Sequence, residues 1–467
     1  MTFPETITLV AYFFVLIILA VYGWHRYYLV YLYVRHREAE PKAGPALSPL
    51  PRVTIQLPLY NEMYVAERLI EAVSRIAYPR ELLQIQVLDD STDETRKIAE
   101  LAIRRLAADG RDVQYLHRTN RAGYKAGALE AGLRRASGEF IAIFDADFLP
   151  TEDFLARLMP HFADPKVGMV QARWGHINQN YSLLTRIQSI LLDGHFVLEH
   201  GGRNRAGRFF NFNGTAGIWR RTAIDDAGGW QHDTLTEDLD LSYRAQLRGW
   251  RFVFAPDVVA PAEVPVEMNA FKSQQHRWAK GSIQTFLKLM PRILQSDQPF
   301  HIKAEAFFHL SANFNYPLMC VLSVLMAPSM VIRYNMGWYE MLLIDVPLFL
   351  AATASVHAHH SFSATYDGNK PVTLRGTVSR LGWSNPHAHI YVDVKNQQTG
   401  QMITWEVESA GASNLLRQGL RKEDFIGAEV IIKGFLAKDG TPTVNASSFT
   451  LVAAKKEFVS DEAAPTP

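Results

Sequence analysis

The sequence predicts a membrane-anchored α/β domain followed by a small all-β domain, and three observations support this. Residues 7–22 carry no charge and, with Gly23 and Trp24, approach the roughly 20 residues that cross a bilayer. Between about residues 50 and 265, short apolar runs alternate with helical patterns, which predicts a parallel sheet with crossover helices. From residue 357 onward, alternating segments and turns replace the long apolar runs and predict an OB-like barrel of about five strands with one helix.

Residues 1–37 are expected to be an uncleaved transmembrane anchor. The first six residues contain no Lys or Arg, whereas a signal peptide begins with a basic region. Arg26, Arg35 and Arg37 follow the apolar run, so the positive-inside rule places the next domain in the cytoplasm. We therefore expect a membrane protein, of the bacterial inner membrane, with a cytoplasmic α/β domain and the lipid bilayer as a partner.

The rest of the chain divides by composition. Residues 50–265 are the predicted α/β domain, and residues 266–306 are predicted interfacial amphipathic helices. Two apolar membrane segments are expected within residues 307–356, and the second contains Asp345, which costs a few kcal/mol in a bilayer unless it is paired. Residues 357–467 are the small β-barrel domain, with its helix at residues 413–420.

Composition excludes two classes of protein. The formal net charge of +1 argues against binding to nucleic acid, which requires a basic face. The single cysteine, Cys320, lies in an apolar segment, so there is no disulfide framework.

The predicted strands cover residues 53–59, 84–89 and 140–147, and the predicted helices between them include residues 66–76 and 94–107. Ligands of such sheets bind beyond the carboxyl ends of the strands. Asp89, Asp90 and Asp93 follow the second strand, where they can accept hydrogen bonds from a nucleotide or cap the next helix.

Asp145 and Asp147 end the third predicted strand. Residues two apart face the same side of a strand, so these carboxylates can bind a divalent ion together with a diphosphate, or form a solvated turn. Lys125, with Arg118 and Arg121 nearby, opens a glycine-containing helix and suits phosphate contact or simply a basic helix start.

Two later motifs carry further candidates. Glu237 and Asp238 open a helix, where the dipole favours acids, and Asp238 is a candidate general base for an acceptor hydroxyl. In residues 274–281, Arg277 could clamp a pyrophosphate and Trp278 could stack on a sugar, although an interfacial membrane helix explains the same pattern.

Taken together and in order, these motifs resemble the family 2 glycosyltransferases of the cellulose-synthase-like type, in particular the glucomannan and mannan synthase branch. The phrases that carry the resemblance, over roughly residues 50–345, are QLPLYNE (56–62), QVLDDSTDET (86–95), GYKAGAL (123–129), AIFDADF (142–148), VQARW (170–174), FNFNGTAGIWR (210–220), AGGW (227–230), TED (236–238) and QQHRW (274–278).

The resemblance implies a GT-A fold and transfer of a sugar with inversion of the anomeric carbon. It implies Mg²⁺ or Mn²⁺ on Asp145 and Asp147, and Asp238 as the base. It further implies a donor such as UDP-glucose or GDP-mannose, and a glycan or lipid-linked acceptor. It assigns Asp90, Gln274 and Arg277 to the donor, Trp278 to the acceptor, and Gln171, Arg173, Trp174 and residues 213–217 to the sugar and acceptor pocket. With the strand-end and helix-start residues above, the expected donor-binding residues are Asp89, Asp90, Lys125, Gln274 and Arg277, and the expected acceptor-binding residues are Trp278 and Trp174.

The chain departs from the resemblance in two places. Synthases of this type carry more than two apolar segments after the QQHRW motif. The tail, with HHSFSATYD and the strands after it, resembles instead a family of small exported bacterial domains of unknown function, and its histidines (His357, His359, His360, His387 and His389) are either metal ligands or solvated. Two other functions stay open, a glycosidase with two carboxylates and a non-catalytic membrane scaffold whose β tail binds a partner or a metal.

Overall fold

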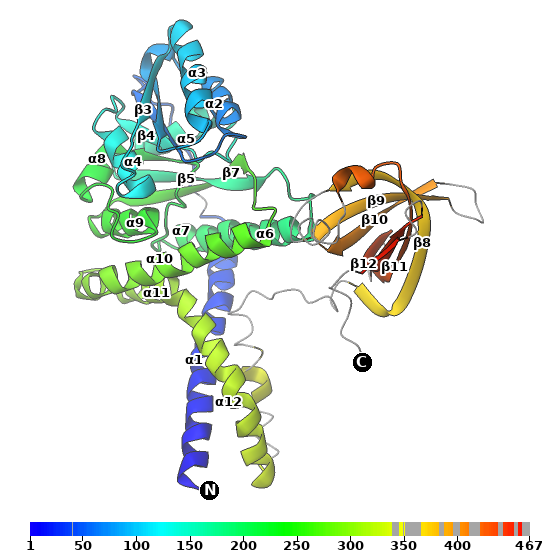
Figure 1. Cartoon of the computed structure of the whole chain (residues 1–467). Coiled ribbons are helices and arrows are strands. Elements are labelled where there is room, and N and C mark those ends of the chain that lie inside the picture. Colours follow the sequence, from blue (N-terminus) through cyan, green and yellow to red (C-terminus); the bar gives the residue numbers. More distant parts are fainter. Residues whose placement is uncertain are drawn as a thin grey trace. The chain divides into compact units, whose positions relative to one another are not determined.

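The computed structural model describes the whole chain except residues 40, 339–344, 349, 351–365, 383–386, 396–401, 411–420, 438–441, 453–455 and 460–467. The chain folds into two units, one of residues 1–264 and 273–357 and the other of residues 265–272 and 358–467. Figure 1 shows the α/β domain of the first unit above a pair of long helices. The predicted helix at residues 413–420, the turn at 396–400 and the histidines at 357, 359 and 360 lie outside the described residues.

A seven-stranded sheet forms the centre of the first unit, in the order β3-β2-β1-β4-β6-β5-β7. Its strands are β1 (Val53–Leu59), β2 (Leu83–Asp89), β3 (Asp112–His117), β4 (Phe140–Ile143), β5 (Val167–His176), β6 (Gly217–Arg220) and β7 (Arg251–Ala262). β1 pairs in parallel with both β2 and β4, β2 with β3, and β5 with β7.

The three predicted strands are parallel to one another, whereas β6, which was not predicted, runs antiparallel to both β4 and β5. Gly217 pairs with Ile143, so β6 starts beside the carboxyl end of β4, and residues 213–216 lie where that strand ends. β4 also ends earlier than predicted, because its pairing with β1 stops at Ile143. Asp145 and Asp147 therefore lie in a loop just beyond the strand.

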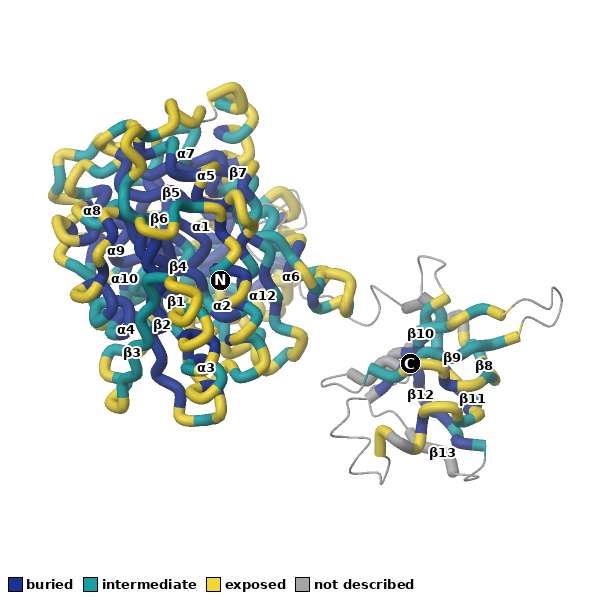
Figure 2. Tube along the Cα trace, turned by 90° about the horizontal axis from the view of Figure 1, so that it is seen from above, coloured by how far each residue is buried: buried dark blue, intermediate teal, exposed yellow. Residues whose placement is uncertain are grey.

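Helices cover both faces of the sheet because the side chains of its buried strands alternate. Phe140 and Ala142 pack with α2 (Ala66–Ser74), α3 (Thr95–Ala108) and α5 (Phe154–Leu158). Ile141 and Ile143 pack on the opposite face with α4 (Tyr124–Leu133), α8 (Arg221–Asp226) and α9 (Glu237–Leu247). Figure 2 shows these strands as a buried layer inside the exposed outer segments.

Several further helices connect the sheet to the long helix pair. α6 (Leu183–Asp193), the π-helix η3 (Gly194–His200) and α7 (Gly201–Arg205) follow one another without a break. α10 (Met268–Gln295) and α11 (Phe300–Ser311) lie between the sheet and the pair in Figure 1.

The pair itself consists of α1 (Phe3–Arg35) and α12 (Asn315–Asn335), which lie side by side. Within the described residues, two stretches are long and apolar enough to cross a membrane, Phe3–Arg35 and Phe300–Asn335. The expected second apolar segment after α11 is described only at residues 345–348 and 350. There Asp345 is buried and pairs with Arg333. Its negative charge therefore has the positive partner that a carboxylate within an apolar segment requires.

The second unit contains a six-stranded sheet in the order β10-β9-β8-β11-β12-β13. The strands are β8 (Tyr366–Gly382), β9 (His387–Lys395), β10 (Met402–Ala410), β11 (Glu429–Ala437), β12 (Thr443–Leu451) and β13 (Lys456–Val459). β10 also pairs in parallel with β12, which joins five strands in a cycle around a core that includes Val392, Ile432 and Phe449. The all-β prediction is confirmed, although β13 was not expected.

Candidate active site

Three segments that are far apart in the sequence meet at the side chain of Lys125. Lys125 lies in the first turn of α4, and its Nζ is 2.5 Å from Oδ1 and 2.7 Å from Oδ2 of Asp145. The same ammonium group donates a hydrogen bond of 3.0 Å to the carbonyl oxygen of Gly214. The backbone N–H of Asp145 donates to Oγ1 of Thr215 at 2.9 Å, so the 213–217 loop fixes both partners.

Asp238 reaches the same place from α9. A Cβ atom added to Gly214 would lie 3.1 Å from Oδ2 of Asp238 and 3.4 Å from Nζ of Lys125. Gly214 also has a positive φ of 79°, which a residue with a side chain rarely adopts. A glycine at this position therefore leaves the space in which the carboxylate and the ammonium group lie close together.

Two carboxylates of this site, those of Asp238 and Asp147, are harder to ionise than ordinary ones. Burial and the neighbouring Glu237 raise the pKa of Asp238 to about 7. Burial and the nearby Asp145 likewise raise the pKa of Asp147 to about 7. Burial lowers the pKa of Lys125, but the negative charges of Asp145 and Glu237 outweigh it, so that pKa is raised and the ammonium form is favoured.

Asp145 and Asp147 fit a divalent ion that shares its ligands with a substrate. Both offer carboxylate oxygens, which Mg²⁺ and Mn²⁺ prefer. Within the described residues, no group of three or more His, Cys, Asp or Glu side chains is placed to hold a metal ion. A site with only two protein carboxylates suits an ion that is completed by phosphate oxygens and water.

The two aspartates after β2 have different environments. Asp90 forms a two-point ion pair with Arg118, with distances of 2.8 and 2.5 Å, and Arg118 also donates to the carbonyl oxygens of Ala122 and Tyr124. Asp89 is fully buried, and its oxygens accept from the N–H of Ser91 and the hydroxyl of Tyr115. The carboxylate of Asp89 is thus held inside the fold, and its contact with a donor stays a prediction.

Strained backbone surrounds these acids. Asn61, Arg121 and Tyr124 have φ values of 57°, 39° and 50°. The guanidinium of Arg121 lies 3.2 Å from the centre of the Tyr60 ring. Non-glycine residues with positive φ are uncommon and concentrate at functional sites.

Gln171 lies inside the fold and supports the 213–217 loop of the site. It is fully buried, its Nε2 donates to the carbonyl oxygens of Thr215 and Ala216, and its Oε1 accepts from the N–H of Asn213. The residue thus holds the 213–217 loop, and its part in the shape of a sugar pocket stays a prediction.

The two predicted acceptor tryptophans lie on different elements. Trp174, on β5, packs edge-on against Phe148, and its Nε1 is buried with no hydrogen-bond partner among the described residues. Beside it, Arg173 donates to the carbonyl oxygen of Pro256. Trp278, on α10, is 36% exposed.

α10 is fixed against the start of α9. A Cβ atom on Gly281 would lie 2.5 Å from Cγ2 and 2.9 Å from the backbone nitrogen of Thr236, and Leu235 donates to Gln284 at 2.9 Å. Gln274, Arg277 and Trp278 lie in the one to two turns before Gly281. Arg277 is exposed, and in the described part of the chain none of these three side chains has a hydrogen bond or an ion pair, so the structure does not join them to the carboxylates.

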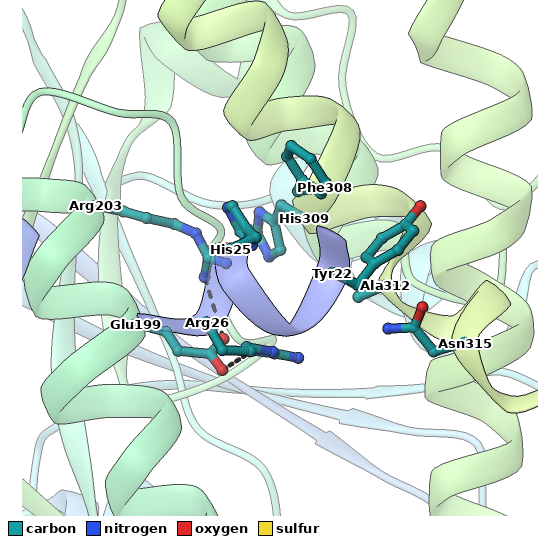
Figure 3. Close-up of a pocket in the computed structure, with 9 residues that line it drawn as sticks. All are labelled: Tyr22, His25, Arg26, Glu199, Arg203, Phe308, His309, Ala312 and Asn315. Carbon is teal, nitrogen blue, oxygen red and sulfur yellow. Dashed lines mark hydrogen bonds and ion pairs between the residues drawn. The ribbon is translucent and has the colours of Figure 1, made fainter. Parts of the chain in front are cut away.

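A buried polar cluster near the top of α1 was missed by the sequence analysis (Figure 3). Glu305 of α11 accepts from Arg203 of α7 at 2.9 Å and lies 3.0 Å from His25 of α1. Glu199 pairs with Arg26, and His309 lies 2.8 Å from the hydroxyl of Tyr243 on α9. His25, Arg26, Glu199, Arg203 and His309 of this cluster line a cavity of about 30 Å³, and these five are drawn in Figure 3. Glu199 and Arg203 are four residues apart on consecutive helical segments and pair with each other, but no spacing in the sequence links them to His25, Arg26, Glu305 or His309, which lie on other helices.

Comparison with known proteins agrees with this geometry. Residues 51–281 match the family described as "Glycosyltransferase like family 2". Residues 51–281 form a family 2 glycosyltransferase domain. Residues 348–445 match a family of unknown function, DUF6152.

Curated relatives of the glycosyltransferase domain are plant enzymes. Glucomannan 4-beta-mannosyltransferase 2 of Arabidopsis thaliana is 44% identical over 254 residues, which is 53% of this chain and 48% of that protein. Glucomannan 4-beta-mannosyltransferase 1 of Cyamopsis tetragonoloba is 45% identical over 249 residues, which is 52% of this chain and 47% of that protein. The chain thus spans about half the length of these relatives.

A solved structure shares the fold of the glycosyltransferase domain. The mannosyltransferase PcManGT from Pyrobaculum calidifontis, in complex with GDP-Man and Mn²⁺, aligns with a TM-score of 0.52 at 23% identity and covers 73% of this chain and 98% of that one. The predicted GT-A-like α/β fold is therefore confirmed.

Proposed function

We propose that this chain is a metal-dependent, inverting hexosyltransferase that moves mannose from GDP-mannose to a hydroxyl group of a β-linked glycan. The observation that carries the proposal is the meeting of Asp145, Asp238 and Lys125 at one point beyond the sheet. The choice of mannose draws support from the names of the relatives, which are 4-beta-mannosyltransferases.

Asp238 is the proposed general base. The acceptor oxygen attacks C1 of the sugar, its proton passes to the carboxylate of Asp238, and the bond from C1 to the diphosphate oxygen breaks. A single displacement of this kind inverts C1, so an α-linked GDP-mannose gives a β-linked product. A pKa of about 7 suits this role, because a general base works best when its pKa is near the working pH.

Asp145 and Asp147 are the proposed ligands of Mg²⁺ or Mn²⁺, and when bound this ion stabilises the charge that develops on the diphosphate. Lys125, Gln274 and Arg277 are proposed to contact the diphosphate, and Asp90 the nucleoside. We assign Asp89 to positioning, because its carboxylate is buried. Trp278 and the indole N–H of Trp174 are proposed to meet the acceptor.

We further propose that α1 and the α11–α12 stretch anchor the enzyme in a bacterial inner membrane, with the catalytic domain in the cytoplasm. The outward side chains of α1 include Val10, Phe14 and Ile17, which are more than half exposed and would otherwise face water. Arg35 ends α1 and Arg37 follows it, on the side of the catalytic domain.

The test incubates membranes that contain the chain with radiolabelled GDP-mannose, GDP-glucose or UDP-glucose and a manno-oligosaccharide acceptor. Size and linkage analysis should show β-linked mannose, and membranes with Asp238→Asn serve as the blank. Preference for UDP-glucose would overturn the choice of donor. Failure to transfer sugar from every donor would favour the scaffold hypothesis, and cleavage of the acceptor would favour a glycosidase.

A further inference from the structure

The ammonium group of Lys125 occupies the place where the site needs positive charge. It contacts both oxygens of Asp145, and Asp145 is one of the two proposed metal ligands. Glu237 and Asp238 also act on it electrostatically, so one lysine balances several carboxylates. In this arrangement Lys125 and a metal ion compete for Asp145.

The protein alone provides few ligands for the ion. Asp145 and Asp147 are the two proposed ligands, and within the described residues no group of three or more His, Cys, Asp or Glu side chains is placed to hold a metal ion. The diphosphate of a nucleotide would add oxygen ligands for the metal. It would also give Lys125 a new anionic partner, because lysine binds phosphates as a compact point charge.

We propose that Lys125 is a counter-ion switch, which neutralises Asp145 in the free enzyme and moves to the diphosphate when the nucleotide binds, so that metal and nucleotide bind cooperatively. The proposal rests on the proposed function of this site and goes beyond it, since donor contact alone predicts no effect of Lys125 on metal affinity in the absence of nucleotide.

The surroundings of Lys125 allow the movement. Its side chain is 28% exposed, and that of Asp145 is 33% exposed, so neither is locked in the core. Besides the two oxygens of Asp145, the ammonium group contacts the carbonyl oxygen of Gly214, a residue that has no side chain to block the movement. Lysine also carries four rotatable bonds, and small rotations move Nζ by more than an ångström.

The experiment measures Mn²⁺ binding to the full chain in detergent by the loss of the free Mn²⁺ signal in electron paramagnetic resonance, with and without GDP. The wild-type chain should bind Mn²⁺ more tightly when GDP is present. Lys125→Met should bind Mn²⁺ alone at least about tenfold more tightly than wild type, the lower end of the effect of a neighbouring opposite charge on a carboxylate. The gain from GDP should become smaller, because coupling is reciprocal.

Lys97→Met is the matched control. Lys97 is an exposed lysine of α3 that pairs with Glu94, so its replacement should leave Mn²⁺ affinity unchanged. Asp145→Asn should lose Mn²⁺ binding in both conditions. Thermal melting checks that each variant is folded, and Lys125→Gln repeats the test with a polar side chain.

Unchanged or weaker binding of Mn²⁺ alone by folded Lys125→Met and Lys125→Gln would overturn the switch. The arm without GDP needs no nucleotide, so it distinguishes this failure from failure of the proposed function. If GDP does not bind at all, the proposed function falls, and the switch falls with it because the diphosphate partner is then missing.

Discussion

At Asp238, burial and the charge of Glu237 disfavour the ionised carboxylate, whereas Lys125 favours it. The balance leaves the pKa at about 7, more than two units above that of an ordinary aspartate. The proton therefore leaves this group in the pH range in which a general base is useful, and this depends on side chains from α4 and α9 together.

Asp238→Asn should leave a folded chain that still binds GDP with metal but transfers sugar roughly 10²–10⁴-fold more slowly. Asn keeps the shape of Asp and accepts the hydrogen bond from the N–H of Leu239, but it cannot take up a proton. Initial rates of sugar transfer and GDP titrations measure the two effects. Asp225→Asn, at an exposed carboxylate of α8, is the control. If Asp238→Asn kept a rate above about a tenth of wild type, Glu237 would be the next candidate for the base.

The rate of transfer at saturating substrate should rise with pH through about 7, because only the ionised form of Asp238 accepts a proton. In Glu237→Gln the neighbouring negative charge is gone, so the pKa of Asp238 should fall and the acid limb should move to lower pH. A pH–rate profile of both proteins checks the direction. A limb that stays in place or moves upward in the variant would show that Glu237 does not set this pKa.

Site residues at the ends of strands and the starts of helices could be predicted from the sequence, whereas the buried residues that support the site could not. Asp145 follows a strand, and Lys125 and Asp238 lie in the first turns of two helices, all with clear sequence patterns, and the structure brings these three together. Asp89 and Gln171 carry the same polar chemistry, but both are fully buried, and burial depends on tertiary contacts. A sequence pattern does not tell such a residue from one that faces a ligand.

Among the elements, α10 packs against the start of the helix that carries the proposed base. Gly281 packs on Thr236, directly before Glu237, so the distance between the two helices is set by the absence of a side chain at this position. Gln274, Arg277 and Trp278 depend on this contact for their distance from Asp238.

Gly281→Ala should therefore slow sugar transfer by about 10²-fold, because a misplacement of about 1 Å has an effect of this size. Its Cβ atom would lie 2.5 Å from Thr236 and push α10 away. The matched control is Gly194→Ala, since a Cβ atom at Gly194 meets nothing within 4 Å. The measurement compares the rates of sugar transfer by Gly281→Ala and Gly194→Ala. Equal rates would show that the position of α10 does not affect the reaction.

Element prediction succeeded where periodicity was long and failed where it was short. β1 and β2 were predicted within one residue of their observed bounds, because seven consecutive residues of each form an apolar or alternating run. β6 has four residues and its direction depends on where the 213–217 loop enters the sheet, which no local pattern encodes.

On the scale of the whole molecule, the polar cluster of Figure 3 ties α1 to the catalytic domain. Glu305 is almost fully buried and contacts His25 and Arg203 from two other helices. Glu305→Gln should destabilise the fold on the order of 3–5 kcal/mol, because it leaves Arg203 as a buried charge with a weaker partner.

The melting temperature of the purified chain in detergent should fall by several degrees in Glu305→Gln. Glu100→Gln, which breaks an exposed pair with Arg104, should change it little, since exposed pairs contribute about 0–1 kcal/mol. If both variants melted alike, the cluster would not hold the helices together.

Deletion of residues 357–467 should leave sugar transfer largely intact. The proposed site residues all lie between residues 89 and 278, within the unit that holds the seven-stranded sheet. The transfer rate of a correctly inserted deletion variant measures this, and loss of nearly all activity would assign the DUF6152 region a part in the reaction.

The pairing of Arg333 with Asp345 has a consequence for biogenesis. If the α11–α12 stretch enters a bilayer as proposed, Arg333 would bring a bare positive charge toward the hydrocarbon, at a cost of a few kcal/mol. Asp345 emerges from the ribosome twelve residues later and cancels that charge. Partition into lipid should then be concerted, with α12 and residues 345–348 leaving the translocon as one hairpin, and a nascent chain arrested between the two residues should insert poorly.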